Sequence, residues 1–141
     1  DKEYVKSLEP LLRQAPAVRI RSPRPYKELI KTLNQYDVGI HLLPPVNFNH
    51  RWALPNKVFD YIQARLGIVV GPSPEMARLV KKNALGKVTE GYEAQDLAKA
   101  LETLSTEDVQ RFKSASDKAA KTLSAETAAL GWEQAIEALL A

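Results

Sequence analysis

The sequence contains no cysteine, only two histidines and no long apolar run. Without cysteine, the chain forms no disulfide and has no thiolate for catalysis. His41 and His50 are nine positions apart and show no metal-ligand pattern, so we expect no metal site. No apolar run approaches the roughly 20 residues of a membrane-spanning helix. We therefore expect a cytoplasmic protein.

The charge of the chain is small overall but unevenly distributed. The 141 residues carry a net charge of +3, with 45% apolar and 26% charged residues, as in one soluble globular domain. Residues 1–92 hold 15 Lys or Arg against 8 Asp or Glu, and residues 93–141 hold 5 against 9. A basic body fits a small anionic ligand. Nucleic acid is not expected as a partner, because no dense basic run is interleaved with aromatic residues. Ordinary solvated charges are the alternative explanation.

Hydrophobic periodicity predicts strands and helices in alternation. Strands are predicted at residues 18–20, 37–43, 68–70 and 86–89. Helices are predicted at residues 2–14, 26–35 and 55–66, from residue 73 onward, and then at 93–104, 106–122 and 125–140. This order indicates an α/β fold with a Rossmann-like parallel sheet of about four strands, closed by C-terminal helices. We expect residues 1–122 to form a partial Rossmann-like domain and residues 123–141 to form its closing helix.

The helix predicted to start at Pro55 has two unlike faces. Its apolar side is formed by Val58, Phe59, Ile62 and Leu66. The opposite arc gathers an amide, a cation and a carboxylate within two turns: Asn56, Lys57 and Asp60. Because this helix follows a strand, its start lies at the carboxyl edge of the sheet, where α/β proteins bind ligands.

These polar groups suit a ligand with hydroxyls and an anionic group. A carboxylate accepts hydrogen bonds from two vicinal hydroxyls, as on a ribose, and a nearby lysine meets a phosphate or a sugar oxygen. Unpaired N–H groups at the helix start also favour an anion. The structural alternative is an exposed Lys57–Asp60 ion pair that contributes roughly a few tenths of a kcal/mol.

The segment PNKVFDYIQARLGIVV, which begins at Pro55, resembles the nucleotide-sugar segment of GT-B retaining glycosyltransferases, P-x-K-x-(F/L)-E-(Y/A)-x-A-x-G-x-P-V. The resemblance extends over about residues 17–104 through the order of the segments. It implies that Asp60 binds the donor's ribose hydroxyls, beside Lys57 and Asn56. The turn at Ser22 and Pro23 matches the place where the nucleobase is read.

The loop at residues 44–54 resembles the family loop that wraps the donor's sugar and diphosphate. It holds Pro45, His50 and Arg51, and the two basic side chains are candidates for phosphate or sugar contacts. A solvated loop position is the alternative for both of them. Phe48 and Trp52 are expected to pin the loop to the core. We interpret His41, on its apolar strand, as a core histidine with satisfied hydrogen bonds.

The resemblance implies transfer of a sugar from a nucleotide diphosphate sugar to a hydroxyl acceptor, in polysaccharide or glycoconjugate biosynthesis. No metal or other cofactor is expected, because basic groups and helix N-termini stabilise the leaving diphosphate. The expected partners are the donor and an N-terminal acceptor-binding domain of the same protein. That domain would also account for peripheral association with the inner face of the membrane.

The chain departs from the family pattern at three places. Position 60 is Asp rather than Glu, Ala53 stands where a second glutamate is frequent, and the A-x-G-x-P-V stretch lacks its glycine and proline. A catalytically degenerate nucleotide-sugar-binding or regulatory module is therefore an alternative, and an unrelated doubly wound domain is another. Two family strands and the Arg and Lys of the phosphate clamp have no counterpart in the sequence. We expect a longer protein to supply them, and residues 1–141 alone to be inactive.

Overall fold

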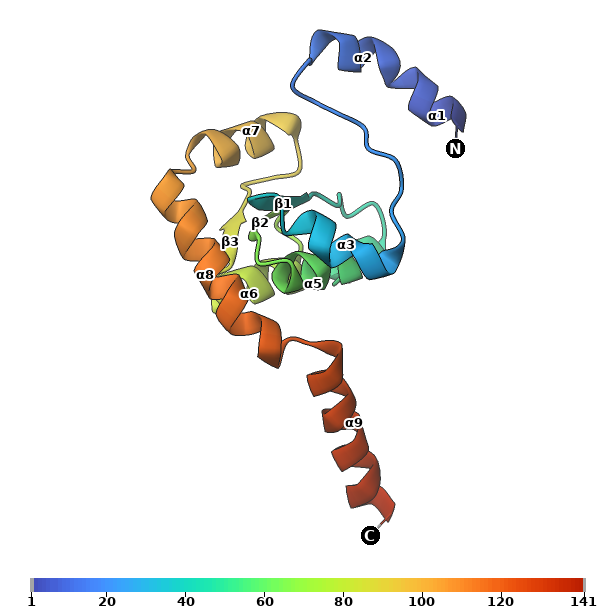
Figure 1. The fold of residues 1–141 in the computed structure, drawn as a ribbon, viewed down its shortest axis with the longest axis vertical. Helices are drawn as coiled ribbons and strands as arrows, with labels where there is room; N and C mark the ends of the chain where they lie inside the picture. The colour runs from blue at the N-terminus through green and yellow to red at the C-terminus, as the bar shows by residue number, and fades with distance from the viewer. Residues whose placement is uncertain (1, 141) are drawn as a thin grey trace.

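The computed structural model describes residues 2–140 and shows an α/β fold around a small parallel sheet (Figure 1). The sheet has the order β1-β2-β3, and both pairs of neighbours are parallel. The strands are β1 (Val38–His41), β2 (Gly67–Val70) and β3 (Gly86–Val88). The predicted α/β class and parallel pairing are therefore confirmed.

Helices precede, connect and follow the strands. They are α1 (Lys2–Ser7), α2 (Glu9–Gln14), α3 (Tyr26–Leu33), α4 (Phe48–Trp52), α5 (Asn56–Gln63), α6 (Pro74–Lys82), α7 (Ala94–Glu102), α8 (Thr106–Thr122) and α9 (Ala125–Leu140). The connection from β1 to β2 runs through α4 and α5, and the connection from β2 to β3 runs through α6. A parallel sheet needs such crossovers, because each strand must return to the same edge before the next one begins.

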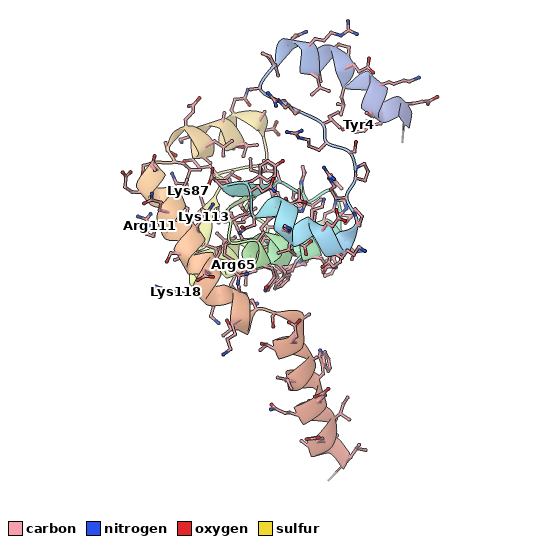
Figure 2. The ribbon with its side chains drawn as sticks, in the orientation of Figure 1. Tyr4, Arg65, Lys87, Arg111, Lys113 and Lys118 are labelled. Carbon is pink, nitrogen blue, oxygen red and sulfur yellow. The ribbon has the colours of Figure 1, made fainter. Side chains whose placement is uncertain are left out.

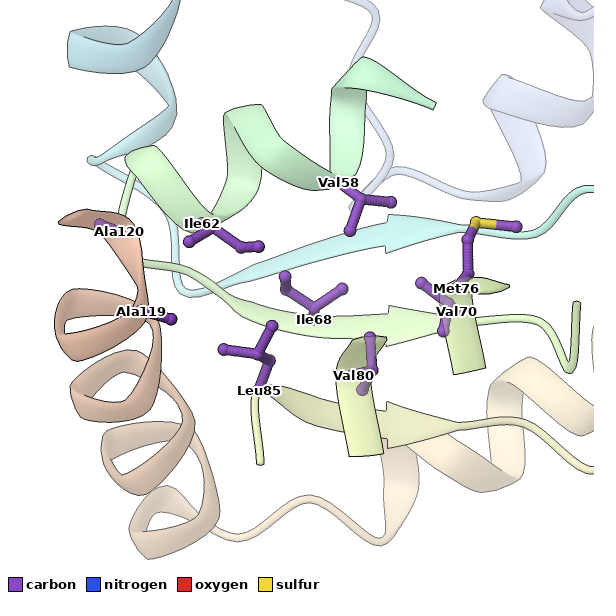
Figure 3. Packing of buried hydrophobic residues seen from close by; sticks show 9 residues of the cluster. All are labelled: Val58, Ile62, Ile68, Val70, Met76, Val80, Leu85, Ala119 and Ala120. Carbon is purple, nitrogen blue, oxygen red and sulfur yellow. The ribbon is translucent and has the colours of Figure 1, made fainter. Parts of the chain in front are cut away.

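Strand β2 is the centre of the core, and all four of its residues are buried. Its Ile68 and Val70 pack in one cluster with Val58 and Ile62 of α5 (Figure 3). The cluster also takes in Met76, Val80 and Leu85, together with Ala119 and Ala120 of α8. Full burial of each large side chain contributes about 1.5–3 kcal/mol, so this layer accounts for much of the stability.

Helix α8 is attached to the sheet by polar groups as well as by packing. The Ser116 hydroxyl is buried and donates to the carbonyl of Leu66 at 2.6 Å. At the surface, Lys113 lies 3.0 Å from the Asp37 carboxylate, and Arg65 forms an ion pair with α8 (Figure 2). Exposed ion pairs are worth about 0–1 kcal/mol, so the buried hydroxyl is the stronger polar attachment.

The strand predicted at residues 18–20 is absent, so that prediction is wrong. Val18 and Ile20 are 58% and 54% exposed and lie in a coil that leads from α2 to α3, away from the sheet (Figure 1). Alternating residues form a strand only beside a partner strand, and this segment has none within residues 2–140. Residues 2–140 therefore contain three strands instead of the four predicted.

Two helix predictions also need correction. The helix predicted at residues 2–14 is interrupted by a turn at Leu8, and α2 restarts with Pro10 in its first turn. Proline fits there because first-turn N–H groups have no helical partner. The loop at 44–54 contains α4, which is capped by Asn47 accepting from the backbone N–H of His50 at 2.8 Å.

The two last helices behave differently. Helix α8 packs on β2 and α5, whereas α9 projects from the body and all of its residues are exposed (Figure 1). The break between them falls at Leu123 and Ser124. Closure of the sheet by the C-terminal helices is therefore limited to α8 in this structure.

A side chain at position 39 should destabilise the fold. A Cβ atom at Gly39 would overlap the ring of Tyr61, whose hydroxyl donates to the carbonyl of Ile40 at 3.1 Å. Gly39→Ala is expected to lower the free energy of unfolding in urea by about 1–3 kcal/mol. Gly131→Ala in α9 is the control, because nothing lies within 4 Å of the added atom. Equal stabilities for the two variants would contradict this packing.

Removal of the buried hydroxyl of α8 tests how that helix is attached. Ser116→Ala is expected to cost about 1 kcal/mol, because the variant loses the hydrogen bond to the Leu66 carbonyl. Ser114→Ala changes an exposed serine of the same helix and is expected to have little effect. Both values are measured by urea unfolding. A loss in the Ser114 variant as large as that in the Ser116 variant would show that the hydroxyl is unimportant.

Candidate functional site

A pocket of about 650 Å³ lies between α3, the outer side of α5 and the junction of α8 with α9. Its polar wall includes Tyr26, Asn56 and Asp60, and its apolar wall includes Phe59 and Leu123. Val58 and Ile62 turn the apolar side of α5 to the sheet, so residues 56 and 60, one turn apart, face away from it together. Two of the predicted site residues, Asn56 and Asp60, thus meet in one pocket.

The Asp60 carboxylate is bound to a hydroxyl in the structure. The Tyr26 hydroxyl donates to Asp60 Oδ1 at 3.1 Å. This hydrogen bond, and after it the negative charge of Asp60, raise the pKa of Tyr26, because both favour the protonated phenol. Tyr26 lies thirty-four positions from Asp60 in sequence, and it is not among the predicted site residues. The one sequence signal for Tyr26 is its place three residues after Pro23, at the start of the predicted helix.

Other polar groups of the pocket are used within the protein. The Gln63 amide donates to the carbonyls of Ala120 and Leu123 at 2.8 and 3.3 Å. The Thr127 hydroxyl donates to the carbonyl of Lys121 at 2.7 Å. By contrast, the Asn56 side chain has no hydrogen-bond partner within residues 2–140, and Asp60 has one oxygen beyond that held by Tyr26. Asn56 and Asp60 are therefore the groups available to a ligand.

Lys57 lies outside this pocket. No ion pair joins it to Asp60 within the described part of the chain, so the alternative interpretation of these two residues as a surface pair fails. The charge of Lys57 instead affects His41, which lies at the carboxyl end of β1. Burial, and then the charge of Lys57, lower the pKa of His41. The cation and the carboxylate predicted to act together are thus on different sides of the start of α5.

The carboxyl edge of the sheet carries a second polar feature. Ser73, which follows β2, is buried, and its hydroxyl lies 3.1 Å from the hydroxyl of Tyr92. The residue is the N-cap of α6, but its side chain makes no capping hydrogen bond. The Tyr92 ring lies where a side chain at Gly71 would be, which brings the two hydroxyls together. No local sequence pattern indicates this long-range pairing.

The remaining predicted residues do not line the pocket. Ser22 and Pro23 lie in exposed coil before α3, and Pro45 is exposed in the loop. The Arg51 guanidinium stacks 5.9 Å from the centre of the Trp52 ring. His50 Nδ1 is buried without a hydrogen-bond partner in the described residues.

Two expectations about core contacts are wrong. Phe48 and Trp52 contact each other, with ring centres 6.4 Å apart, but they are 75% and 45% exposed and so do not anchor the loop in the core. They lie on α4, a short helix that holds both rings near the surface. His41 is partly buried, and its Nε2 has no hydrogen-bond partner among residues 2–140. The Nε2 atom of His41 is therefore an unsatisfied polar atom rather than a satisfied core group.

No family model, no curated protein and no solved structure matches this chain. Within residues 2–140, no helix is long and apolar enough to cross a membrane. The same residues contain no group of three or more His, Asp or Glu side chains arranged to hold a metal ion. The chemistry of the pocket and the sequence pattern on α5 are therefore the basis for a function.

The environment of His41 predicts a pH dependence of stability. Its pKa is lower in the folded state than its ordinary value of about 6.5, so the unfolded chain binds the proton first. The stability from neutral His41 is complete above that value and is lost as pH falls through the folded pKa. In His41→Gln, the decrease in unfolding free energy below pH 6.5 should be smaller than in the wild type.

Urea unfolding of both proteins at several pH values checks this difference. Measurements at pH 8 separate any loss of packing in the variant from the titration. Parallel pH profiles for the two proteins would show that His41 is not the titrating group.

Proposed function

We propose that this chain is the donor-binding part of a glycosyltransferase, and that its α/β fold is a Rossmann-like C-terminal domain of the GT-B type. The pocket between α3, α5 and the α8–α9 junction takes the nucleoside of a nucleotide diphosphate sugar. The proposal combines the sequence pattern of α5 with the groups that the pocket makes available.

The observation that carries the proposal is the environment of Asp60. Its carboxylate already accepts a hydroxyl, that of Tyr26, inside a pocket of a size suited to a small molecule. Its second oxygen and the Asn56 amide remain for further hydroxyls. A carboxylate with two acceptor oxygens and a neighbouring amide matches the vicinal diol of a ribose.

The rest of the pocket suits the nucleobase. Phe59 and Leu123 contribute apolar surface, and the alanines at the start of α9 leave room beside them. A planar base gains from burial against such a surface, and the base itself offers hydrogen-bonding edges to nearby main chain. The exposed coil at Ser22 and Pro23 lies three to four residues before Tyr26 in sequence, which places main-chain groups within a few residues of the pocket wall.

The diphosphate requires a different location, because no Lys or Arg lines the pocket. The start of α5 has no side-chain cap, so its first N–H groups are available to an anion. Lys57 is in the same turn. A donor whose ribose contacts Asp60 would extend its phosphates around the start of α5 towards Lys57. This path uses the cation and the carboxylate on different sides of one helix end.

In a transfer reaction, these groups would bind the donor and stabilise the leaving diphosphate without forming a covalent bond to it. The acceptor and the remaining catalytic groups would come from an N-terminal domain of the same protein. Ala53, which replaces the glutamate that contacts the sugar in the family pattern, supports the alternative of a binding or regulatory module without turnover. Donor binding without transfer to any acceptor would favour that alternative.

Replacement of Asp60 tests the proposed donor site. Asp60→Ala should weaken binding of UDP, GDP or their sugars by about 1–3 kcal/mol, because the ribose loses its charged acceptor. Asp60→Asn, which keeps the shape but removes the charge, should show a smaller loss. Isothermal titration calorimetry of the protein with each nucleotide gives these values.

The matched control is Glu102→Ala, which removes an exposed carboxylate of α7 that does not line the pocket. Its nucleotide affinity should equal that of the wild type. Undiminished binding in Asp60→Ala would refute the ribose contact, and absence of nucleotide binding by the wild type would refute the proposed function itself.

A further inference from the structure

We propose that Tyr26 competes with the ligand for Asp60, so that its hydroxyl must leave the carboxylate when a vicinal diol binds. This inference rests on the proposed function, and it adds a residue that sets the affinity of the same site. The observation behind it is the hydrogen bond from the Tyr26 hydroxyl to Asp60 Oδ1 at 3.1 Å.

Competition arises because the Tyr26 hydroxyl and the two hydroxyls of a diol would all use the same carboxylate. A vicinal diol bound across a carboxylate uses both of its oxygens, one for each hydroxyl. In the structure, Tyr26 uses Oδ1, and Oδ2 is left for a ligand. The Asn56 amide accepts a hydrogen bond in place of one oxygen, but it carries no charge and forms the weaker contact. An arrangement in which each hydroxyl of the diol has one carboxylate oxygen to itself therefore requires Tyr26 to leave.

The surroundings of Tyr26 allow it to leave at low cost. It is the first residue of α3 and is 73% exposed, so its ring has few packing contacts to lose. The rest of α3 packs on α5 and does not need to move. A side-chain rotation therefore releases the hydroxyl to water while the walls formed by α5 and the α8–α9 junction stay in place.

The state of the phenol supports this assignment. The hydrogen bond to Asp60 and the carboxylate charge raise the pKa of Tyr26, so the phenol stays protonated and remains a donor throughout the neutral range. The tyrosine thus occupies Asp60 as a substrate hydroxyl would, whatever the pH of an ordinary binding experiment.

A positioning role for Tyr26 predicts the opposite result. If the hydroxyl served to orient Asp60 for the ligand, its removal would weaken binding. If it competes, its removal frees Oδ1 and strengthens binding of ligands with a diol, while ligands without a diol are unaffected. Tyr26→Phe separates the two roles because it deletes the hydroxyl and keeps the ring.

The experiment compares wild type and Tyr26→Phe in titrations followed by NMR. The probes are uridine and guanosine, which carry the diol without phosphates, and their 2′,3′-dideoxy forms, which lack it. Tyr26→Phe should bind the diol nucleosides about two- to tenfold more tightly, the range expected for one net hydrogen bond. The dideoxy forms should bind both proteins equally.

Tyr36→Phe is the control, because Tyr36 is also exposed but does not line the pocket. Its affinities should equal those of the wild type. Thermal unfolding of each variant confirms that an affinity change does not come from a folding defect, and the exposure of Tyr26 predicts an unchanged unfolding temperature.

The outcomes distinguish this inference from the function on which it rests. Equal or weaker nucleoside binding by Tyr26→Phe, with nucleotide diphosphates bound by the wild type, overturns the competition and leaves the function standing. Tighter diol-dependent nucleoside binding without any binding of UDP or GDP supports the competition and overturns the function. No binding of any probe by either protein overturns both.

Discussion

The packing of α5 on β2 is the constraint on which the rest of the structure depends. Val58 and Ile62 are completely buried against Ile68 and Val70. Each successive residue of a helix is rotated by about 100°, so these two contacts set the direction of every other side chain of α5. Asn56 and Asp60 face the pocket as a consequence. Any other rotation of the helix would expose these apolar side chains. Each exposed side chain would lower the stability of the fold by about 1.5–3 kcal/mol.

The C-terminal end of α5 is also fixed by hydrogen bonds to other elements. Tyr61 covers Gly39 and donates to the carbonyl of Ile40, which holds the helix over β1. Gln63 donates to the last turn of α8 and to Leu123, which holds the α8–α9 junction against the helix. The pocket therefore has one wall on a rigid helix and another on the junction from which α9 projects. Its polar groups are held by packing that does not involve a ligand.

The sequence predicted the parts of the fold that local pattern determines. The apolar face of α5 and the apolar run of β2 were predicted, because burial on one or both faces of an element determines the spacing of its apolar residues. The end of α5 was placed less well. The predicted helix runs to residue 66, yet α5 ends at Gln63, the chain turns with Arg65 at a φ of 60°, and Gly67 begins β2.

Features that depend on distant partners were not predictable in this way. Residues 18–20 alternate as a strand does, but alternation records a preference that only a neighbouring strand satisfies. The contact between Tyr26 and Asp60 joins residues thirty-four positions apart and leaves no periodic signal. Likewise, a helical wheel places Lys57 near Asp60, because it ignores which neighbouring element lies beside each one.

The separation of Lys57 from Asp60 limits the kinds of ligand that this region can bind. The pocket offers a carboxylate, an amide and apolar surface, all suited to a neutral ligand with hydroxyls. The cation lies near His41, at the carboxyl end of β1. A free phosphate would use only the second set of groups, and a simple sugar only the first. A ligand with a neutral, hydroxyl-bearing part joined to an anionic part uses both, and a nucleoside diphosphate has this composition. This two-sided arrangement around one helix start is the physical reason to prefer the proposed donor over smaller ligands.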